Sequence, residues 1–176
     1  MGDVIRITGF YHELPQFSFV MRRDVLFSLN TDKTDEREFL EVNNQASKIL
    51  GEANMKLVDF CGYADHSSRP GHYAIFWELS DGASMEDSIL VRCCRNLDVS
   101  FNDPYQRGRA AGTIGPLRLY IVKKGTFENI MLRAIESGAS PTQYKTPRCV
   151  KSPKLLKILK DSVVHLYINS GHENVN

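Results

Sequence analysis

The spacing of apolar residues along the chain predicts short strands interrupted by helices. Residues 3–10 and 16–21 alternate between two kinds of side chain with a period of two, which predicts a β-hairpin closed by a loop of about five residues. A polar interruption follows at residues 22–24. Beyond it, compact apolar runs predict four more strands, at residues 25–29, 55–61, 72–79 and 117–122.

Four other segments repeat apolar residues at helical spacing. They run from Thr34 to Gly51, from Ser84 to Phe101, from Thr126 to Gly138 and from Pro153 to Leu166. Each begins at a residue that suits a helix start: a Ser or Thr that can cap it, or a proline at the first helical position. Pro104 is expected to stop the second helix, and the Arg- and Gly-rich residues 106–115 are expected to form a loop.

The element order from residue 25 is β-α-β-β-α-β, followed by two helices. This order predicts an α+β fold: an antiparallel sheet in split β-α-β (ferredoxin-like) order, with helices mainly on one face and extra C-terminal helices. A β-hairpin precedes it. Because a two-stranded hairpin is only marginally stable alone, residues 1–21 are interpreted as the edge of a larger unit.

Composition narrows the class of protein. The 176 residues are 42% hydrophobic and 24% charged, enough to build one packed core and too apolar for a disordered chain. No run approaches the roughly 18 apolar residues of a membrane span, and the N-terminus lacks the layout of a signal peptide, so we expect a cytoplasmic protein without a membrane partner. The net charge of +1 excludes a strongly basic or acidic protein.

The four cysteines, Cys61, Cys93, Cys94 and Cys149, have no zinc-ligand spacing. We interpret them as reduced structural thiols and expect no metal site. His66 and His72 have no clear third ligand beside them.

Three groups of residues are candidates for chemistry. They are Asp3 before the first strand with Arg22 nineteen residues later, Asp32-Lys33 at a strand-to-helix junction, and the basic cluster Lys145, Arg148, Lys151 and Lys154. Each group taken singly also fits a turn or a solvated surface.

Five stretches give these residues a context: GDVIRITGFYHELPQFSFVMRR, LNTDKTDE, RPGHYAIFWEL, GTF and QYKTPRCVKS. In this order they resemble the C-terminal part of the plant acyl acid amido synthetases, the auxin-responsive Gretchen Hagen family of adenylate-forming enzymes. The resemblance implies a ligase that uses ATP and Mg²⁺ to turn a hormone-type carboxylic acid (auxin, jasmonate or benzoate) into an acyl-adenylate. The amine of an amino acid then displaces AMP to form an amide.

The resemblance also implies roles for individual residues. Asp3 matches an aspartate that binds the ribose, Arg22 a hinge arginine near the nucleotide, and Lys33 a catalytic lysine that reaches the phosphate. A lysine suits the last role because it is a compact charge on a mobile stem, and adenylation develops negative charge on the α-phosphate. Lys145 and Lys154 are expected near the adenylate or the amino-acid carboxylate.

By the same resemblance, residues 1–23 are the terminal hairpin of a missing large domain plus a hinge, and residues 24–176 are a mobile C-terminal domain. The partner is therefore a large N-terminal domain within a monomeric enzyme, and the chain alone is expected to be inactive. The alternative is a ferredoxin-like nucleic-acid or protein-binding module, because such sheets stack bases on exposed aromatics. The RNA-binding strand signature is absent and the net charge is small, so no nucleic-acid partner is expected.

Overall fold

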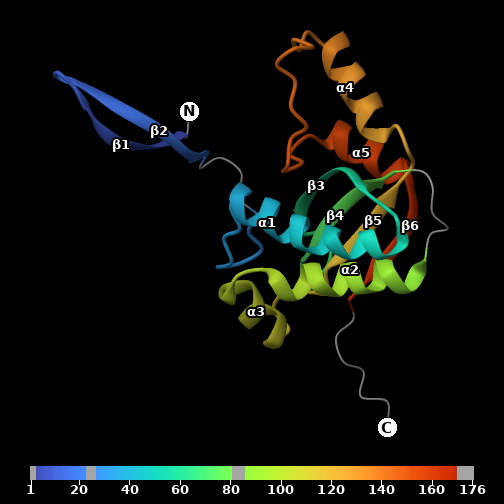
Figure 1. The fold of residues 1–176 in the computed structure, drawn as a ribbon. Helices are drawn as coiled ribbons and strands as arrows, with labels where there is room; N and C mark the ends of the chain where they lie inside the picture. The colour runs from blue at the N-terminus through green and yellow to red at the C-terminus, as the bar shows by residue number, and fades with distance from the viewer. Residues whose placement is uncertain (1–2, 23–26, 81–85, 170–176) are drawn as a thin grey trace.

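The computed structural model describes residues 3–22, 27–80 and 86–169. The strands are β1 (Asp3–Tyr11), β2 (Leu14–Arg22), β3 (Leu57–Asp65), β4 (His72–Leu79), β5 (Arg118–Val122) and β6 (Val163–Ile168). The helices are α1 (Glu36–Ser47), the 3-10 helix η1 (Lys48–Ala53), α2 (Asp87–Ser100), α3 (Asp103–Ala110), α4 (Thr126–Glu136) and α5 (Pro153–Asp161). None of these helices is long and apolar enough to cross a bilayer. The α+β class and the N-terminal hairpin are confirmed (Figure 1).

The main sheet has four strands in the order β3-β4-β5-β6. The β3–β4 and β5–β6 pairs are antiparallel, whereas β4 and β5 are parallel. The prediction of an antiparallel sheet is therefore wrong for the central pair. The chain leaves the end of β4, crosses back through α2 and α3, and re-enters the sheet as β5 at the end where β4 begins, which is the crossover that parallel neighbours need.

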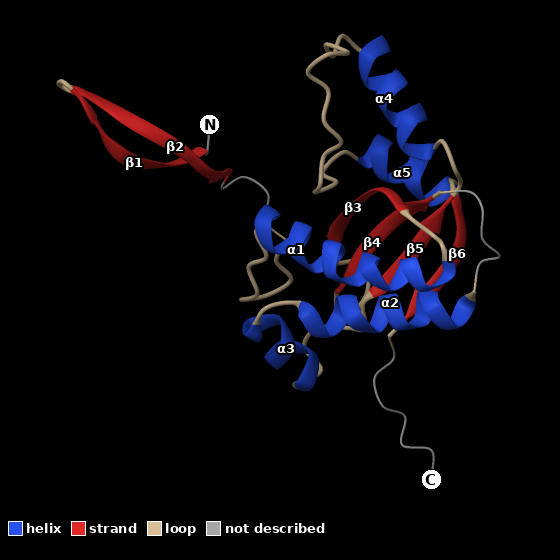
Figure 2. Ribbon diagram, in the orientation of Figure 1, coloured by secondary structure: helices blue, strands red, loops and turns tan. Residues whose placement is uncertain are grey.

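Helices cover both faces of this sheet, which corrects the expectation that they lie mainly on one (Figure 2). Tyr73, Ile75 and Trp77 of β4 share one core with apolar residues of α1 and α2. Phe76, on the opposite face, packs in a second core with residues of α4 and α5. Successive side chains of a strand point to opposite faces of the sheet. Because helices cover both faces, β4 is buried from His72 to Glu78, which agrees with its predicted place in the core.

Two predicted elements differ from those in the structure: the strand at residues 25–29 and the end of the last helix. Of the expected strand 25–29, residues 25 and 26 lie outside the described ranges, and Phe27 forms only an isolated bridge with Thr34. The fourth strand of the sheet is β6, and its first four residues, 163–166, were assigned to the last helix. Its apolar residues fit either period, and pairing with β5 settles them as a strand.

Several boundaries also move. The predicted loop 106–115 contains most of α3, because Asn102 caps that helix and Pro104 falls in its first turn. Thus Pro104 helps to begin a helix rather than only ending one. Asp35 caps α1 in place of Thr34, and Ser84, the expected cap of α2, lies outside the described residues.

The hairpin of β1 and β2 projects away from the sheet and its helices (Figure 1). Only His12 and Glu13 connect the two strands, a shorter turn than the predicted loop. The hairpin leaves large apolar side chains in solvent, and these are Ile5, Ile7, Phe10, Tyr11, Leu14 and Phe17.

Cys61, Cys93 and Cys94 are buried and Cys149 is partly buried, all with free thiols. Burial raises the pKa of Cys93 and Cys94 to about 12, so both stay protonated and unreactive at neutral pH.

Candidate functional site

Lys33 lies in a short loop whose backbone is held by the buried carboxylate of the preceding residue, Asp32. Asp32 is 1% exposed, and it accepts hydrogen bonds from the backbone N–H groups of Leu29 at 3.0 Å and Asn30 at 2.7 Å. The hydroxyl of Tyr73 donates to the other oxygen of Asp32 at 2.5 Å. Burial and this bond raise the pKa of Tyr73, which therefore remains a donor at neutral pH.

The residue after Lys33 is fixed as firmly. Thr34 is fully buried, exchanges two backbone hydrogen bonds of 3.0 Å with Phe27, and places its hydroxyl 3.1 Å from that of Tyr73. Lys33 itself is exposed. The loop therefore presents a lysine to solvent from a backbone that is held on both sides.

Lys145 has a similar setting on the segment between α4 and α5. Lys145 is exposed, while its neighbours Tyr144 and Thr146 are partly buried. The Thr146 hydroxyl donates to Asp59 of β3 at 2.6 Å, and the guanidinium of Arg148 pairs with the same carboxylate. The segment then bridges to the edge of β3, where Gly62 donates to the carbonyl of Arg148 at 2.9 Å.

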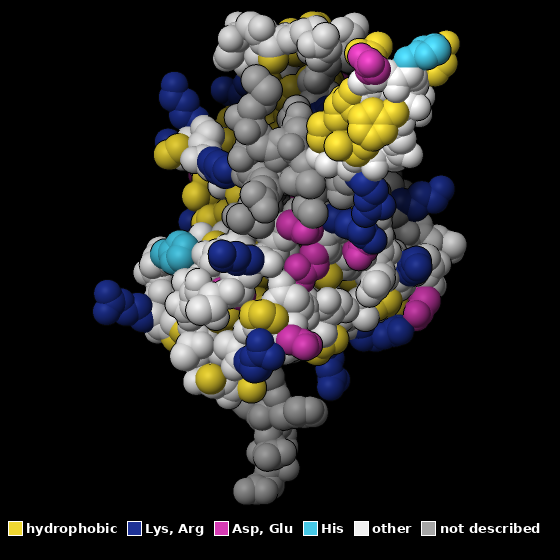
Figure 3. All heavy atoms as spheres, turned by 90° about the vertical axis from the view of Figure 1, so that its left-hand side faces the viewer, with side chains coloured by type: hydrophobic (Ala, Val, Ile, Leu, Met, Phe, Trp, Pro, Cys, Tyr) yellow, Lys and Arg dark blue, Asp and Glu magenta, His cyan; other side chains and the backbone are white. Residues whose placement is uncertain are grey.

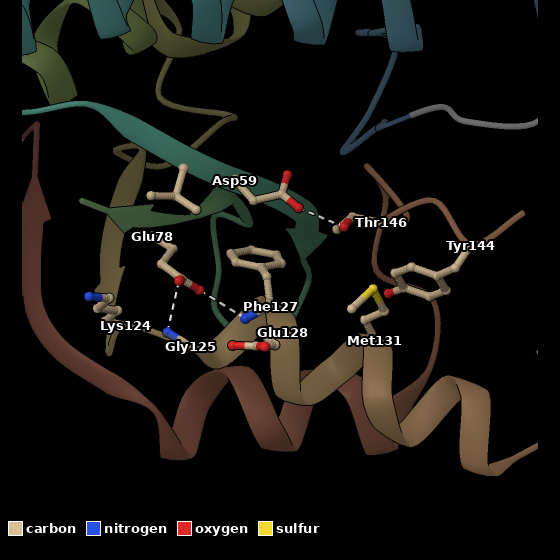
Figure 4. A pocket seen from close by; sticks show the side chains of 10 residues that line it. Asp59, Glu78, Lys124, Gly125, Phe127, Glu128, Met131, Tyr144 and Thr146 are labelled. Carbon is tan, nitrogen blue, oxygen red and sulfur yellow. Dashed lines mark hydrogen bonds between the residues drawn. The ribbon is translucent and has the colours of Figure 1, made fainter. Parts of the chain in front are cut away.

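Tyr144 and Thr146 line a cavity of about 490 Å³ between β3, the end of β4 and the start of α4 (Figure 4). Its lining residues are Val58, Asp59, Glu78, Lys124, Gly125, Phe127, Glu128, Met131, Tyr144 and Thr146. Three of the sequence motifs, FWEL, GTF and QYKTPR, therefore meet here. The partly buried carboxylate of Asp59 and the buried one of Glu78 are already bonded to groups of the protein, and Lys145 does not line the cavity.

Asp3 and Arg22 are brought together by the hairpin. They are direct partners in the β1–β2 register, at the end of the hairpin away from its turn. Two residues that are nineteen positions apart in the sequence thus face each other across the hairpin. Only the backbone of these two residues is described.

Lys154 is exposed in the first turn of α5, where the Ser152 hydroxyl caps the helix. Because α5 lies across the sheet from α1, Lys154 is on the other layer from the loop of Lys33. The loop before α1 and the segment between α4 and α5 both lie on the side from which the hairpin projects (Figure 1).

Figure 3 views this side directly and shows Lys and Arg side chains mixed with Asp and Glu side chains. Such mixing is unlike the continuous basic surface that nucleic acids bind. In the ranges that the structure describes, no three His, Cys, Asp or Glu side chains are grouped so as to hold a metal ion.

Sequence reasoning singled out the lysines but missed what holds them. Tyr73 was assigned to the core alone, and Asn102, which donates to the backbone carbonyl of Lys33 at 3.2 Å, was not considered. These contacts span 41 and 69 residues, and no local pattern links positions so far apart.

The chain is similar to known proteins over nearly its whole length. The GH3 family C-terminal domain matches residues 37–154. The chain is 41% identical over 173 residues to the indole-3-acetic acid-amido synthetase GH3.3 of Arabidopsis thaliana, covering 96% of this chain and 29% of that protein. It is 43% identical over 174 residues to the jasmonoyl-L-amino acid synthetase JAR4 of Nicotiana attenuata, covering 97% of this chain and 30% of that protein.

Among solved structures, the GH3.15 acyl acid amido synthetase superposes with a TM-score of 0.85 at 38% identity. This match covers 96% of the chain and 32% of the GH3.15 chain. The chain therefore spans less than a third of the length of the relatives that it matches.

Proposed function

Since the chain belongs to the GH3 family through its C-terminal domain, we propose that it is the C-terminal part of an ATP-dependent acyl acid amido synthetase. The complete enzyme activates a hormone-type carboxylic acid (auxin, jasmonate or benzoate) as an acyl-adenylate and transfers the acyl group to an amino acid. Relatives named for indole-3-acetic acid and for jasmonate are 41% and 43% identical to the chain. This near equality supports the proposal that the acid is selected outside this chain, in the large N-terminal domain.

The single observation that carries the proposal is the fixed loop of Lys33. In the adenylation transition state, negative charge builds on the α-phosphate, and a cation that is already in place lowers the barrier. A loop anchored by Asp32 and Thr34 keeps the Lys33 backbone in one position, so only the side chain has to be ordered when the nucleotide arrives. We assign the phosphate contact to Lys33.

The nucleotide's other contacts are proposed for the hairpin. We assign the ribose hydroxyls to Asp3 and a contact beside the nucleotide to Arg22. Their direct pairing in the hairpin register supports a shared ligand. ATP is the proposed co-substrate. Mg²⁺ is expected from the family resemblance, but the described residues offer it no ligand cluster.

We further propose that Lys145, and with it Lys154, binds the adenylate or the carboxylate of the incoming amino acid. The case for Lys145 is the stronger one, since Thr146 and Arg148 tie its segment to Asp59. Lys154 is supported only by its exposure in the first turn of α5.

Two domains follow from this assignment. Residues 1–23 would be the last hairpin of the large domain with the hinge, and residues 24–176 the domain that closes over the nucleotide. The hairpin's exposed apolar side chains support this division, because a two-stranded hairpin needs a partner to bury them. The partner is a large N-terminal domain.

Acid-dependent exchange of labelled pyrophosphate into ATP tests the proposal. The chain alone is expected to give no exchange. A chimera in which it replaces the C-terminal 29% of the GH3.3 relative is expected to restore acid-dependent exchange and amide formation. Robust exchange by the chain alone, or a folded chimera with none, would overturn the proposal.

A further inference from the structure

Asn102, at the corner between α2 and α3, contacts the loop of Lys33 directly. Its side-chain amide donates to the backbone carbonyl of Lys33 at 3.2 Å and to a carboxylate oxygen of Glu38 on α1 at 2.9 Å. The same amide nitrogen lies 3.4 Å from the hydroxyl of Thr34. One side-chain NH₂ group thus faces only oxygen acceptors of α1 and the loop.

The other groups of Asn102 are also engaged. Its side-chain oxygen accepts from the backbone N–H of Tyr105 at 3.0 Å, which caps α3. Its own backbone N–H donates to the second oxygen of Glu38 at 2.8 Å. Asn102 is therefore held in place by two helices while its amide reaches the loop.

These contacts fix the peptide unit that joins Lys33 to Thr34. The carbonyl of this peptide accepts from Asn102, and its N–H donates to the carbonyl of Phe27 at 3.0 Å. A planar peptide that is bonded at both ends cannot rotate without breaking a hydrogen bond. Since this plane is attached to the Cα of Lys33, its orientation sets the direction in which the lysine leaves the backbone.

We propose that Asn102 is a positioning residue for Lys33, and that its side-chain amide aims the lysine at the phosphate. The inference rests on the proposed phosphate role of Lys33 and extends it to a residue 69 positions away. Asn102 acts through the loop and does not touch the substrate. Its contribution appears only in steps that use the lysine.

The variant Asn102→Asp removes the amide donor of this contact. Aspartate keeps the oxygen that caps α3, and a negative charge suits the positive end of that helix. It replaces the NH₂ donor by an acceptor that faces the Lys33 carbonyl and Glu38, so the loop contact is lost. Asn102→Ser also keeps a capping oxygen and adds no charge, which separates loss of the donor from repulsion. The exposed Asn44→Asp on α1 is the matched control.

The first measurement uses the 176-residue chain itself. The NMR order parameters of the Lys33 and Thr34 amides are expected near 0.85 in the parent and in Asn44→Asp, values typical of a rigid backbone. In Asn102→Asp and Asn102→Ser they are expected to fall below about 0.6, the flexible range, while the α3 amides stay ordered. Unchanged order at Lys33 in both variants would overturn the inference.

The second measurement is a double-mutant cycle in the chimera, read by pyrophosphate exchange. Asn102→Asp is expected to lower kcat about tenfold with the KM for ATP changed less than twofold. A fold defect would also lower the apparent kcat, by reducing the amount of active enzyme, but it would do so equally in the Lys33→Ala background. In the Lys33→Ala background, Asn102→Asp is expected to add less than a twofold loss, because the group that it positions is gone.

The two possible failures give different results. If both single variants slow exchange and their losses multiply, Asn102 acts on something other than Lys33 and the inference is wrong while the proposed function stands. If Lys33→Ala leaves exchange unchanged, the phosphate role of Lys33 fails, and the positioning role of Asn102 fails with it.

Discussion

The buried carboxylate of Glu78 accepts a hydrogen bond from the backbone N–H of Phe127, at 2.8 Å. Its second oxygen accepts from the N–H of Gly125, also at 2.8 Å. The end of β4 therefore caps α4, a helix whose own capping residue, Gly125, has no side chain to do so. A carboxylate is favoured here because the N-terminus of a helix carries partial positive charge.

Replacing Glu78 by glutamine is expected to destabilise the fold by about 2 kcal/mol, because an amide NH₂ would face a backbone donor and the charge at the helix end would be lost. Urea unfolding measures the loss. Glu128→Gln, in the first turn of the same helix but exposed, is the matched control and is expected to stay within about 0.5 kcal/mol of the parent. Equal losses in the two variants would show that Glu78 has no special capping role.

Tyr73→Phe is expected to cost about 1–3 kcal/mol, because it removes the hydroxyl that bonds Asp32 and Thr34 and leaves that buried carboxylate oxygen with the longer hydrogen bond from the Leu29 N–H at 3.2 Å. Faster amide exchange at Leu29 and Asn30 should accompany the loss. The control is Tyr120→Phe on β5, whose stacking on Phe76 is kept. Unaltered exchange at both amides would contradict the anchoring role of Tyr73.

Acidification is expected to weaken the fold through His72. Burial, followed by the positive charge of Arg118, lowers its pKa below 6.5, and Lys160 acts in the same direction. Asp65, 3.9 Å away, opposes them without prevailing. The folded protein thus holds His72 neutral, while the unfolded chain takes up a proton near pH 6.5, so stability is full above that pH and falls below it.

Unfolding free energies at pH 7.5 and pH 5.5 measure this effect. The parent is expected to lose more stability between the two values than His72→Gln, whereas the exposed His66→Gln should behave like the parent. The same pH dependence in all three proteins would rule out His72 as its source.

Periodicity was enough to predict the elements that are amphipathic by themselves. The hairpin, α1, β3, β4, α2, β5 and α4 were all expected near their observed places. Failures occurred where pairing decides the structure. Residues 163–168 form a mostly apolar run that suits a helix or a strand, and pairing with the edge of β5 makes them β6. Likewise, Pro104 is compatible with a helix end and with a helix start.

In the candidate site, too, the sequence predicted what local patterns show and missed contacts between distant segments. The sequence singled out Lys33 and Lys145 as candidates, and the structure places both, exposed, on anchored segments; their roles stay predictions. It could not predict the anchors, since Tyr73 reads as one more apolar position of a buried strand and no pattern marks Asn102. Such contacts depend on how α1, α3 and the sheet pack, which local patterns do not encode.

The most direct test of the central claim is Lys33→Ala in the chimera with the large domain, measured by acid-dependent pyrophosphate exchange. Removing a preorganised cation from a developing phosphate charge is expected to slow exchange about 100-fold or more. Lys56→Ala, which removes another exposed lysine, is expected to leave the rate unchanged. Exchange at the parent rate in Lys33→Ala, with the protein folded, would contradict the account.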